Sequence, residues 1–228
     1  MASTPRRHSR NGGLCTRSLL FLALSLGAPQ GGFAQCNTTA AASYRVDYRD
    51  QSAAKVWLIN DITQNHCNAN VQSLKGNIHG NPRFIMDDIH YTLERVPNHR
   101  PCLAAVMKYQ SKKGYPFYPN EAHYPTAECY LLNARQVFPD DYFVVGIMGV
   151  EQYNRGHYEQ AAKTFESVLE KQPKNAEVLY NLGLTYFAMK DYPRAAKSAE
   201  QSYGLGFPLP GLKRKLIQVG AWPPAAAN

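Results

Sequence analysis

Hydrophobic residues in the second half of the chain recur at helical spacing in two consecutive segments. The first stripe, on one side of a helix over 178–187, consists of Val178, Leu179, Leu182, Tyr186 and Phe187. A polar turn at 190–192 follows, and the second stripe consists of Ala195, Ala196 and Ala199. This i, i+3, i+4 spacing predicts two amphipathic helices. The small residues of the second stripe allow the two axes to approach to about 8–10 Å.

The same pattern occurs one period earlier in the chain. Shifting residues 176–208 back by 34 positions places them on 142–174, with Gly183 on Gly149 and Tyr192 on Tyr158. Pro173 ends the earlier pair of helices, and Asn175 is the expected N-cap of the next helix. One helix pair cannot bury its own apolar side, so pairs that recur at a fixed period are expected to stack.

A third helix pair is predicted upstream, within 99–139. Its helices are expected over 100–112, with Leu103, Val106 and Met107 inward, and over 126–138. Between them lies an insertion, 114–125, whose prolines exclude a helix. After the last pair, 210–222 is expected to form a capping helix that covers the final apolar face, followed by a disordered tail at 223–228.

These residues resemble the tetratricopeptide repeat. The matching positions are Ala161, Phe165, Pro173, Leu182, Gly183, Tyr186 and Ala195, while Gln152 and Ala199 depart from the family pattern. The resemblance implies an all-α solenoid of about three helix-turn-helix repeats over 99–222, without catalytic activity or a cofactor. Segments 87–109 and 203–216 are also similar to a group of exported bacterial repeat proteins of unknown function, and this similarity brings no catalytic residues.

The segment before the repeats, 35–98, is expected to be irregular and partly helical. Residues 43–49 alternate and predict an extended segment, and 55–62 fits either a strand or a short helix. Asn, Gly and His dominate 65–80, which predicts a loop. Residues 85–96 fit one more helix without a clear partner.

The N-terminus has the pattern of a secretory signal peptide over 1–34. Four arginines precede the apolar run 19–26, and small residues follow it up to Ala34, after which cleavage is expected. An uncleaved anchor is the alternative. Export would place the mature protein in the periplasm or outside the cell, and the protein would meet the membrane only transiently, through this segment.

Charge adds little to this interpretation. The formal net charge is +8, but four of the 25 basic residues belong to the signal segment, so the mature chain carries an excess of about four over its 17 acidic residues. A nucleic-acid-binding protein usually carries a dense basic stripe. We therefore expect no nucleic-acid partner.

Four cysteines remain after the signal segment: Cys36, Cys67, Cys102 and Cys129. An even number in an exported chain predicts two disulfides, for which three pairings are possible. Because each then closes a local loop, Cys36–Cys67 and Cys102–Cys129 are the favoured pairs. The spacing lacks the C-x-x-C pattern of zinc sites, so no metal is expected.

The concave face of stacked repeats is the expected binding site for a protein or peptide partner. Phasing from Gly149 and Gly183 assigns nine residues to this face: Phe143, Val150, Tyr153, Asn154, Glu177, Tyr180, Asn181, Leu184 and Phe187. The first hypothesis is therefore a non-catalytic adaptor or assembly factor of the cell envelope. A self-associating structural subunit is the second hypothesis, since the repeats could bind identical chains.

Signatures of enzymes are missing from the sequence, which contains no G-x-S-x-G, P-loop or H-E-x-x-H motif. One local cluster remains as a third hypothesis, a metal-binding or hydrolytic protein that uses Asp87, Asp88 and His90. Capping and surface solvation of a helix explain the same three residues.

Overall fold

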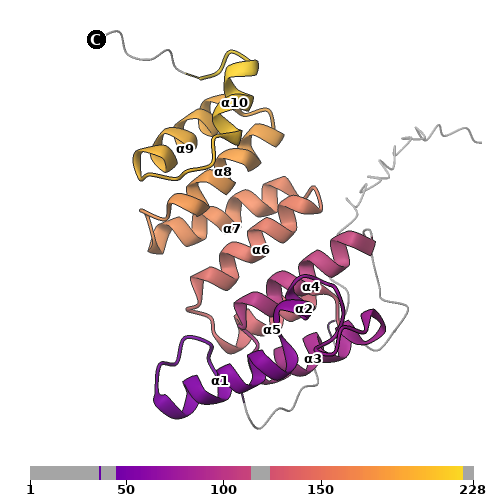
Figure 1. Cartoon of the computed structure of the whole chain (residues 1–228). Helices are drawn as coiled ribbons and strands as arrows, with labels where there is room; N and C mark the ends of the chain where they lie inside the picture. Colours follow the sequence, from indigo (N-terminus) through magenta and orange to yellow (C-terminus); the bar gives the residue numbers. More distant parts are fainter. Residues whose placement is uncertain (1–35, 37–44, 114–123, 223–228) are drawn as a thin grey trace, which may run out of the picture. The chain divides into compact units, whose positions relative to one another are not determined.

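The computed structural model describes residues 36, 45–113 and 124–222, which belong to one compact unit, Cys36–Asn228 (Figure 1). The described part is all-α, with ten α-helices, one 3-10 helix and no strand. The predicted signal peptide at 1–34, the predicted tail at 223–228 and most of the insertion lie outside these residues. None of the described helices has the length and apolar character that crossing a membrane requires.

Two helix pairs form over the segments that the 34-residue period predicts. The first pair is α6 (Tyr142–Asn154) and α7 (Tyr158–Lys171), and the second is α8 (Ala176–Ala188) and α9 (Tyr192–Gly204). Each helix packs against the next one along the chain. Asn175 caps α8 as predicted, since its side-chain oxygen accepts a hydrogen bond from the backbone N–H of Val178 at 3.1 Å.

The predicted upstream pair is also present, as α4 (Arg100–Lys113) and α5 (Ala127–Val137). Leu103 and Val106 are buried in the core between the helices, as expected. The hydroxyl of Thr126 accepts the backbone N–H of Cys129 and caps α5. Both helices agree with the predicted bounds within one residue.

Two glycines allow the close approach of paired helices. A Cβ atom on Gly149 would lie 2.6 Å from the ring of Phe165 on α7. A Cβ atom on Gly183 would lie 2.5 Å from Leu212 and 3.3 Å from the carbonyl oxygen of Ala195 on α9. The repeated glycine is therefore required by packing rather than by backbone conformation.

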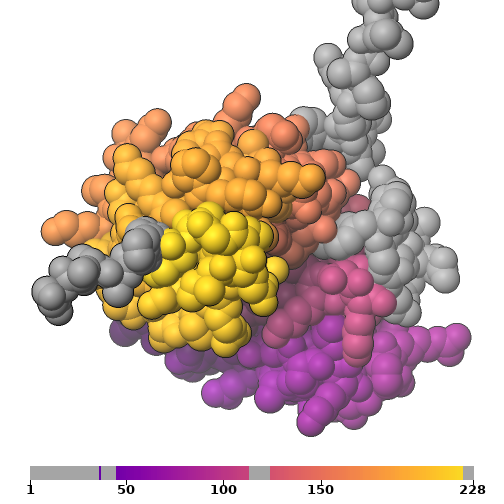
Figure 2. All heavy atoms as spheres, turned by 90° about the horizontal axis from the view of Figure 1, so that it is seen from above, coloured from indigo at the N-terminus to yellow at the C-terminus, as the bar shows by residue number. Residues whose placement is uncertain are grey.

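The capping helix α10 (Gly211–Gln218) covers the end of the array as predicted. Leu212 and Leu216, one helical turn apart, are fully buried against α8 and α9. Trp222 packs its ring on Tyr203 of α9, with centroids 5.8 Å apart. Figure 2 shows the C-terminal residues, in yellow, lying over the orange helices at this end.

The N-terminal region is more helical than expected. It contains α1 (Ala53–His66), the short α2 (Ala69–Gln72), the 3-10 helix η1 (Pro82–Phe84) and α3 (Ile85–Arg95). The segment 55–62 is thus helical, and α3 does have a partner, because α1 packs against it. Sequence patterns missed α1 because its apolar residues form no stripe: Ile59 and Ile62 are buried, whereas Trp57 is 68% exposed.

A buried amide connects the N-terminal segment to the repeats. Asn98, fully buried between α3 and α4, donates hydrogen bonds to Asp47 at 2.8 Å and to Asp141 at 2.7 Å. Arg49 pairs with Asp47 at 2.6 Å and with Asp140 at 3.0 Å. Arg49 and Asn98 lower the pKa of Asp47 to about 2 against the opposing effect of burial, so this carboxylate stays charged. The network joins 45–50 to the turn that precedes α6.

All four cysteines are paired, but with a different connectivity from the favoured one. The structure contains Cys36–Cys129 and Cys67–Cys102, with Cα–Cα distances of 5.3 and 6.1 Å. The preference for local loops was wrong because α4 packs against α2 and α3, which brings Cys67 beside Cys102. Cys129, on α5, is left for Cys36.

Candidate functional site

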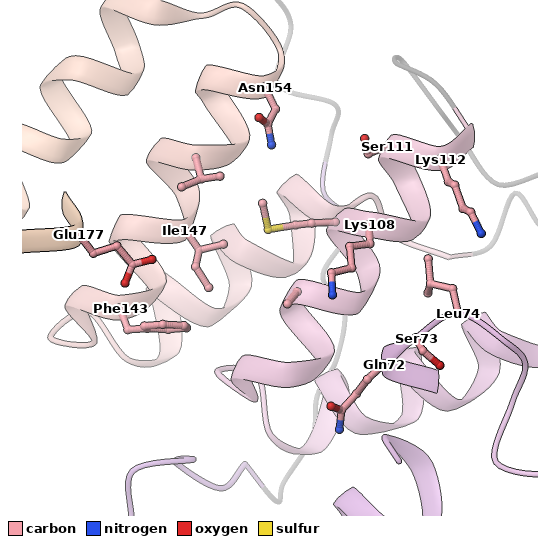
Figure 3. Close-up of a pocket in the computed structure, with 13 residues that line it drawn as sticks. Gln72, Ser73, Leu74, Lys108, Ser111, Lys112, Phe143, Ile147, Asn154 and Glu177 are labelled. Carbon is pink, nitrogen blue, oxygen red and sulfur yellow. The ribbon is translucent and has the colours of Figure 1, made fainter. Parts of the chain in front are cut away.

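A groove of about 720 Å³ lies among α2, α4, α6 and the first turn of α8. Figure 3 shows the side chains that line it. Three of these elements are the first helices of successive helix pairs, which is the side of the array where the sequence places a binding surface. The groove therefore lies along the first helices of the pairs, and α2 extends it.

One wall is a single face of α6. Phe143, Ile147, Val150 and Asn154 follow one another at intervals of four, three and four residues, and therefore project from the same side of the helix. In Figure 3 Phe143 and Ile147 extend toward the helix that carries Lys108. Phe143 is 37% exposed, and the guanidinium of Arg100 lies 4.3 Å from its ring centroid. This wall is apolar along most of its length.

The opposite wall combines apolar and cationic side chains. Its residues come from α4 and from α2 with the turn after it, and they are Gln72, Ser73, Leu74, Ala104, Met107, Lys108, Ser111 and Lys112. Leu74 has a positive φ of 59°, a backbone conformation that a leucine rarely adopts. Met107, a flexible apolar side chain, suits a surface that adapts to a partner. The groove therefore has an apolar floor, formed by Met107, Ile147 and Val150. Lys108 and Lys112 form a polar rim on the α4 side.

Three charged side chains line the groove without an ion pair inside the described part of the chain. Lys108 and Lys112 are exposed on α4, one helical turn apart. Glu177 is exposed on the first turn of α8, on the α6 side of the groove (Figure 3). The ion pairs of the described residues involve other side chains.

Of the nine residues predicted for the concave face, four line this groove and five lie elsewhere. Phe143, Val150, Asn154 and Glu177 line it. The other five are Tyr153, Tyr180, Asn181, Leu184 and Phe187, which lie outside it.

Tyr180 belongs to the core, which corrects its assignment to the concave face. It is only 8% exposed, and its ring packs on Phe207 at 4.6 Å and against Tyr203 at 6.4 Å. The segment that follows α9 folds over this face of α8. The ring of Tyr180 is therefore covered by the segment that follows the second repeat.

Tyr153 and Phe187 occupy equivalent places in successive repeats, and each packs beside the aromatic residue that begins the next helix. The ring centroids of Tyr153 and Tyr158 are 5.4 Å apart, and those of Phe187 and Tyr192 are 5.3 Å apart. Both positions are partly buried against the core of the two repeats. Asn181 and Leu184 are partly buried on α8, outside the groove.

The proposed cluster of Asp87, Asp88 and His90 does not form a shared site. The carboxylate of Asp88 pairs with His66 at 2.9 Å and accepts the backbone N–H of Ile78 at 3.0 Å. Asp87 accepts a hydrogen bond from the hydroxyl of Tyr124 at 2.6 Å. The Nδ1 atom of His90 lies 2.7 Å from the Tyr130 hydroxyl. Each of the three residues thus joins α3 to a different neighbour.

One other group of side chains has the spacing of a metal site. Within the described residues it consists of Cys67, His99 and Cys102, whose ligand atoms lie within 4.8 Å of one another. Because the two sulfur atoms are bonded to each other, neither is a thiolate that could bind a metal. The residues therefore do not fit a metal centre.

His99 is instead a structural residue. Its Nδ1 atom accepts the backbone N–H of Cys102 at 3.3 Å at the start of α4, and its Nε2 atom lies 2.8 Å from the Thr63 hydroxyl oxygen. That hydroxyl donates to the carbonyl oxygen of Ile59 at 2.6 Å, so Nε2 carries the proton. Burial lowers the pKa of His99 to about 4, and the ring is neutral at physiological pH.

The fold is that of a helical-repeat protein, with a groove on the side formed by α4, α6 and α8. Residues 148–206 match the family model of the tetratricopeptide repeat. This part of the chain therefore consists of tetratricopeptide repeats. Domains of this family generally mediate binding of protein partners and are generally non-catalytic. No curated protein matches the sequence.

Sequence reasoning missed the wall formed by α2 and α4. Met107 was expected to face inward, and the residues one step around the helix, Ala104, Lys108 and Ser111, line the groove with it. Applying the three- and four-residue intervals of the α6 wall to α4, the first helix of the preceding pair, would have identified them. No signal in the sequence identifies Gln72, Ser73 and Leu74, because α2 is too short to show a helical period.

Proposed function

We propose that this protein is an exported, non-catalytic adaptor or assembly factor of the cell envelope, which binds a segment of a protein partner in the groove between α4 and α6. The groove itself supports this proposal most directly. It combines an apolar floor with charges at its rim that form no ion pair within the described residues, which is the composition of a peptide-binding surface.

Location in the periplasm or outside the cell is part of the proposal. The basic and apolar pattern of residues 1–34 supports export. Two disulfides are consistent with it, because such bonds persist in oxidising compartments. Sequencing the N-terminus of the protein recovered from cell-envelope fractions tests this part: a chain that starts at Gln35 is expected, and an uncleaved chain in the cytosol would contradict export.

A non-catalytic role is supported by the way the titratable side chains of α3 are used. Asp87, Asp88 and His90 bind separate partners within the protein. Among the described residues, two lysines and one glutamate line the groove, and no histidine or cysteine does. The chemistry of the groove therefore favours binding over proton transfer or nucleophilic attack.

The binding site can be tested by photo-crosslinking in the cells that produce the protein. A photoreactive phenylalanine analogue is placed at Phe143 in the groove or, as the control, at Trp57, which is 68% exposed on α1. We expect an adduct with one other protein from position 143 and none from position 57. Equal adducts from both positions would show that the groove is not the site.

The same experiment separates the two non-catalytic hypotheses. An adduct of twice the mass of the chain, containing only this protein, would favour the self-associating structural subunit and overturn the adaptor. Circular dichroism of each labelled variant verifies that the helical fold is retained. Adducts are identified by mass spectrometry.

A further inference from the structure

We infer that the groove selects a partner segment with two acidic side chains about one helical turn apart, which bind Lys108 and Lys112, beside apolar side chains that contact the floor. This inference rests on the function proposed above and specifies the chemistry of the partner. It is carried by the charges and apolar surfaces of the groove itself.

The lysine pair lacks a structural explanation within the described residues. Like charges at positions i and i+4 of a helix repel each other and destabilise it. Neither Lys108 nor Lys112 forms an ion pair there that would offset this repulsion. Lys112 lies in the last turn of α4, where the helix dipole favours a cation, but Lys108 lies in the middle of the helix. A bound carboxylate would relieve the repulsion.

The floor beside the lysines is suited to apolar side chains of the same partner. Met107 on α4 and Ile147 on α6 are partly buried against the core that α3, α4 and α5 share, and Val150 is partly buried against the core of the two C-terminal helix pairs. All three also line the groove, so part of each surface remains open. A partner that buries this surface gains hydrophobic free energy, while the lysines select its charge.

Glu177 makes the two sides of the groove opposite in charge. It lies on the α6 side, whereas Lys112 and Leu74 lie together on the far side (Figure 3). A carboxylate in the first turn of α8 is favoured by the helix dipole, so Glu177, like Lys112, has a structural reason for its position. It would nevertheless repel an acidic group placed on its side. The acidic side chains of a bound segment are therefore expected toward α4.

The spacing of the lysines defines the probe. Residues four apart on a helix are separated by about 6 Å along its axis. Acidic residues at i and i+4 of a helix, or at i and i+2 of an extended chain, match this distance. We would use fluorescein-labelled 12-residue peptides with identical leucines and, at the two matching positions, glutamates, glutamines or lysines, in a helical and an extended set.

Fluorescence anisotropy with the full mature protein measures the selectivity. The glutamate peptide is expected to bind about three- to tenfold more tightly than the glutamine peptide, the range for two exposed ion pairs, and the lysine peptide more weakly still. The Lys108→Glu/Lys112→Glu variant should reverse this order. The matched control, Lys163→Glu/Lys171→Glu on α7, changes the net charge equally away from the groove and should leave the order unchanged.

The outcomes separate this inference from the proposed function. Equal binding of all peptides that is lost in an Ile147→Asn variant would keep the groove as the site and overturn the charge selectivity alone. The charge selectivity would also be overturned if the groove variant and the α7 control variant changed the preference for glutamate equally. The net charge of the protein, and not the position of the lysines, would then be the cause. Absence of binding by any peptide, or binding that Ile147→Asn leaves intact, would overturn both.

Discussion

Replacing Gly149 with alanine tests why a glycine recurs in each repeat. The added Cβ atom would lie 2.6, 2.8 and 2.9 Å from three carbon atoms of the Phe165 ring. Phe165 is 1% exposed in the core of the repeats, so the ring has little room to move. The substitution therefore forces α6 and α7 apart or displaces the ring.

Two effects of opposite sign decide the result. Alanine in place of glycine stabilises a helix by about 0.8–1.0 kcal/mol. Overpacking of a core costs about 1–3 kcal/mol, and contacts with three atoms of one ring place this case toward the upper end. The net expectation is a loss of about 1–2 kcal/mol in the free energy of unfolding, and a Tm lower by about 2–8 °C.

Gly146 provides a matched control on the same helix. A Cβ atom there would meet only a Val178 methyl carbon at 3.7 Å, which is an ordinary contact. Gly146→Ala should therefore stabilise the protein by up to about 1 kcal/mol. Urea unfolding followed by far-ultraviolet circular dichroism measures both variants.

Gly149→Ala and Gly146→Ala are thus expected to change the free energy of unfolding in opposite directions. If Gly149→Ala stabilises the protein as Gly146→Ala does, close helix packing is not the reason for the glycine. The cost of Gly149→Ala should also shrink in a Phe165→Leu background, because the smaller side chain leaves space for the methyl group.

Two further predictions concern the N-terminal region and its junction with the repeats. Replacing Cys67 and Cys102 together by serine should lower the free energy of unfolding by about 3–4 kcal/mol, since their bond closes a loop of 35 residues. Peptide mapping without reduction should recover the Cys67–Cys102 pair. A peptide in which Cys67 is linked to another cysteine would refute this connectivity. Lowering the pH from about 6.5 to about 4 should reduce the free energy of unfolding by about 3 kcal/mol. The pKa of His99 is lowered to about 4 in the folded state, so over this range the ring binds a proton in the unfolded chain but not in the folded protein. Urea midpoints measured across this range test it, and a nuclear magnetic resonance titration of the His99 ring with a pKa near 6.5 would contradict the burial argument.

The repeats were predictable because each helix has a local signature. Over 142–204 the period of 34 residues, the glycines and the caps all lead to the same helices, and the structure agrees with them. The capping helix was also predictable, because Leu212 and Leu216 form an apolar pair one turn apart. In these segments the residues that specify a helix are also the residues that bury it.

The N-terminal region was less predictable because its stability comes from distant partners. Nothing in the sequence near Asn98 indicates that its amide binds Asp47 and Asp141, which are 51 and 43 residues away. The position of Tyr180 was missed for a related reason. Its repeat position is occupied by Gly146 in the preceding unit, and Phe207, in the segment that follows α9, covers the ring of Tyr180.

The nested order of the two disulfides has a consequence for how the protein matures. If the chain is exported from its N-terminus as proposed, Cys36 and Cys67 reach the oxidising compartment first, and these two are not partners in the structure. Cys36 finds its proper partner only after 93 more residues have followed. Oxidation in order of arrival would therefore join the wrong thiols, and correct assembly would depend on an isomerase or on delayed oxidation.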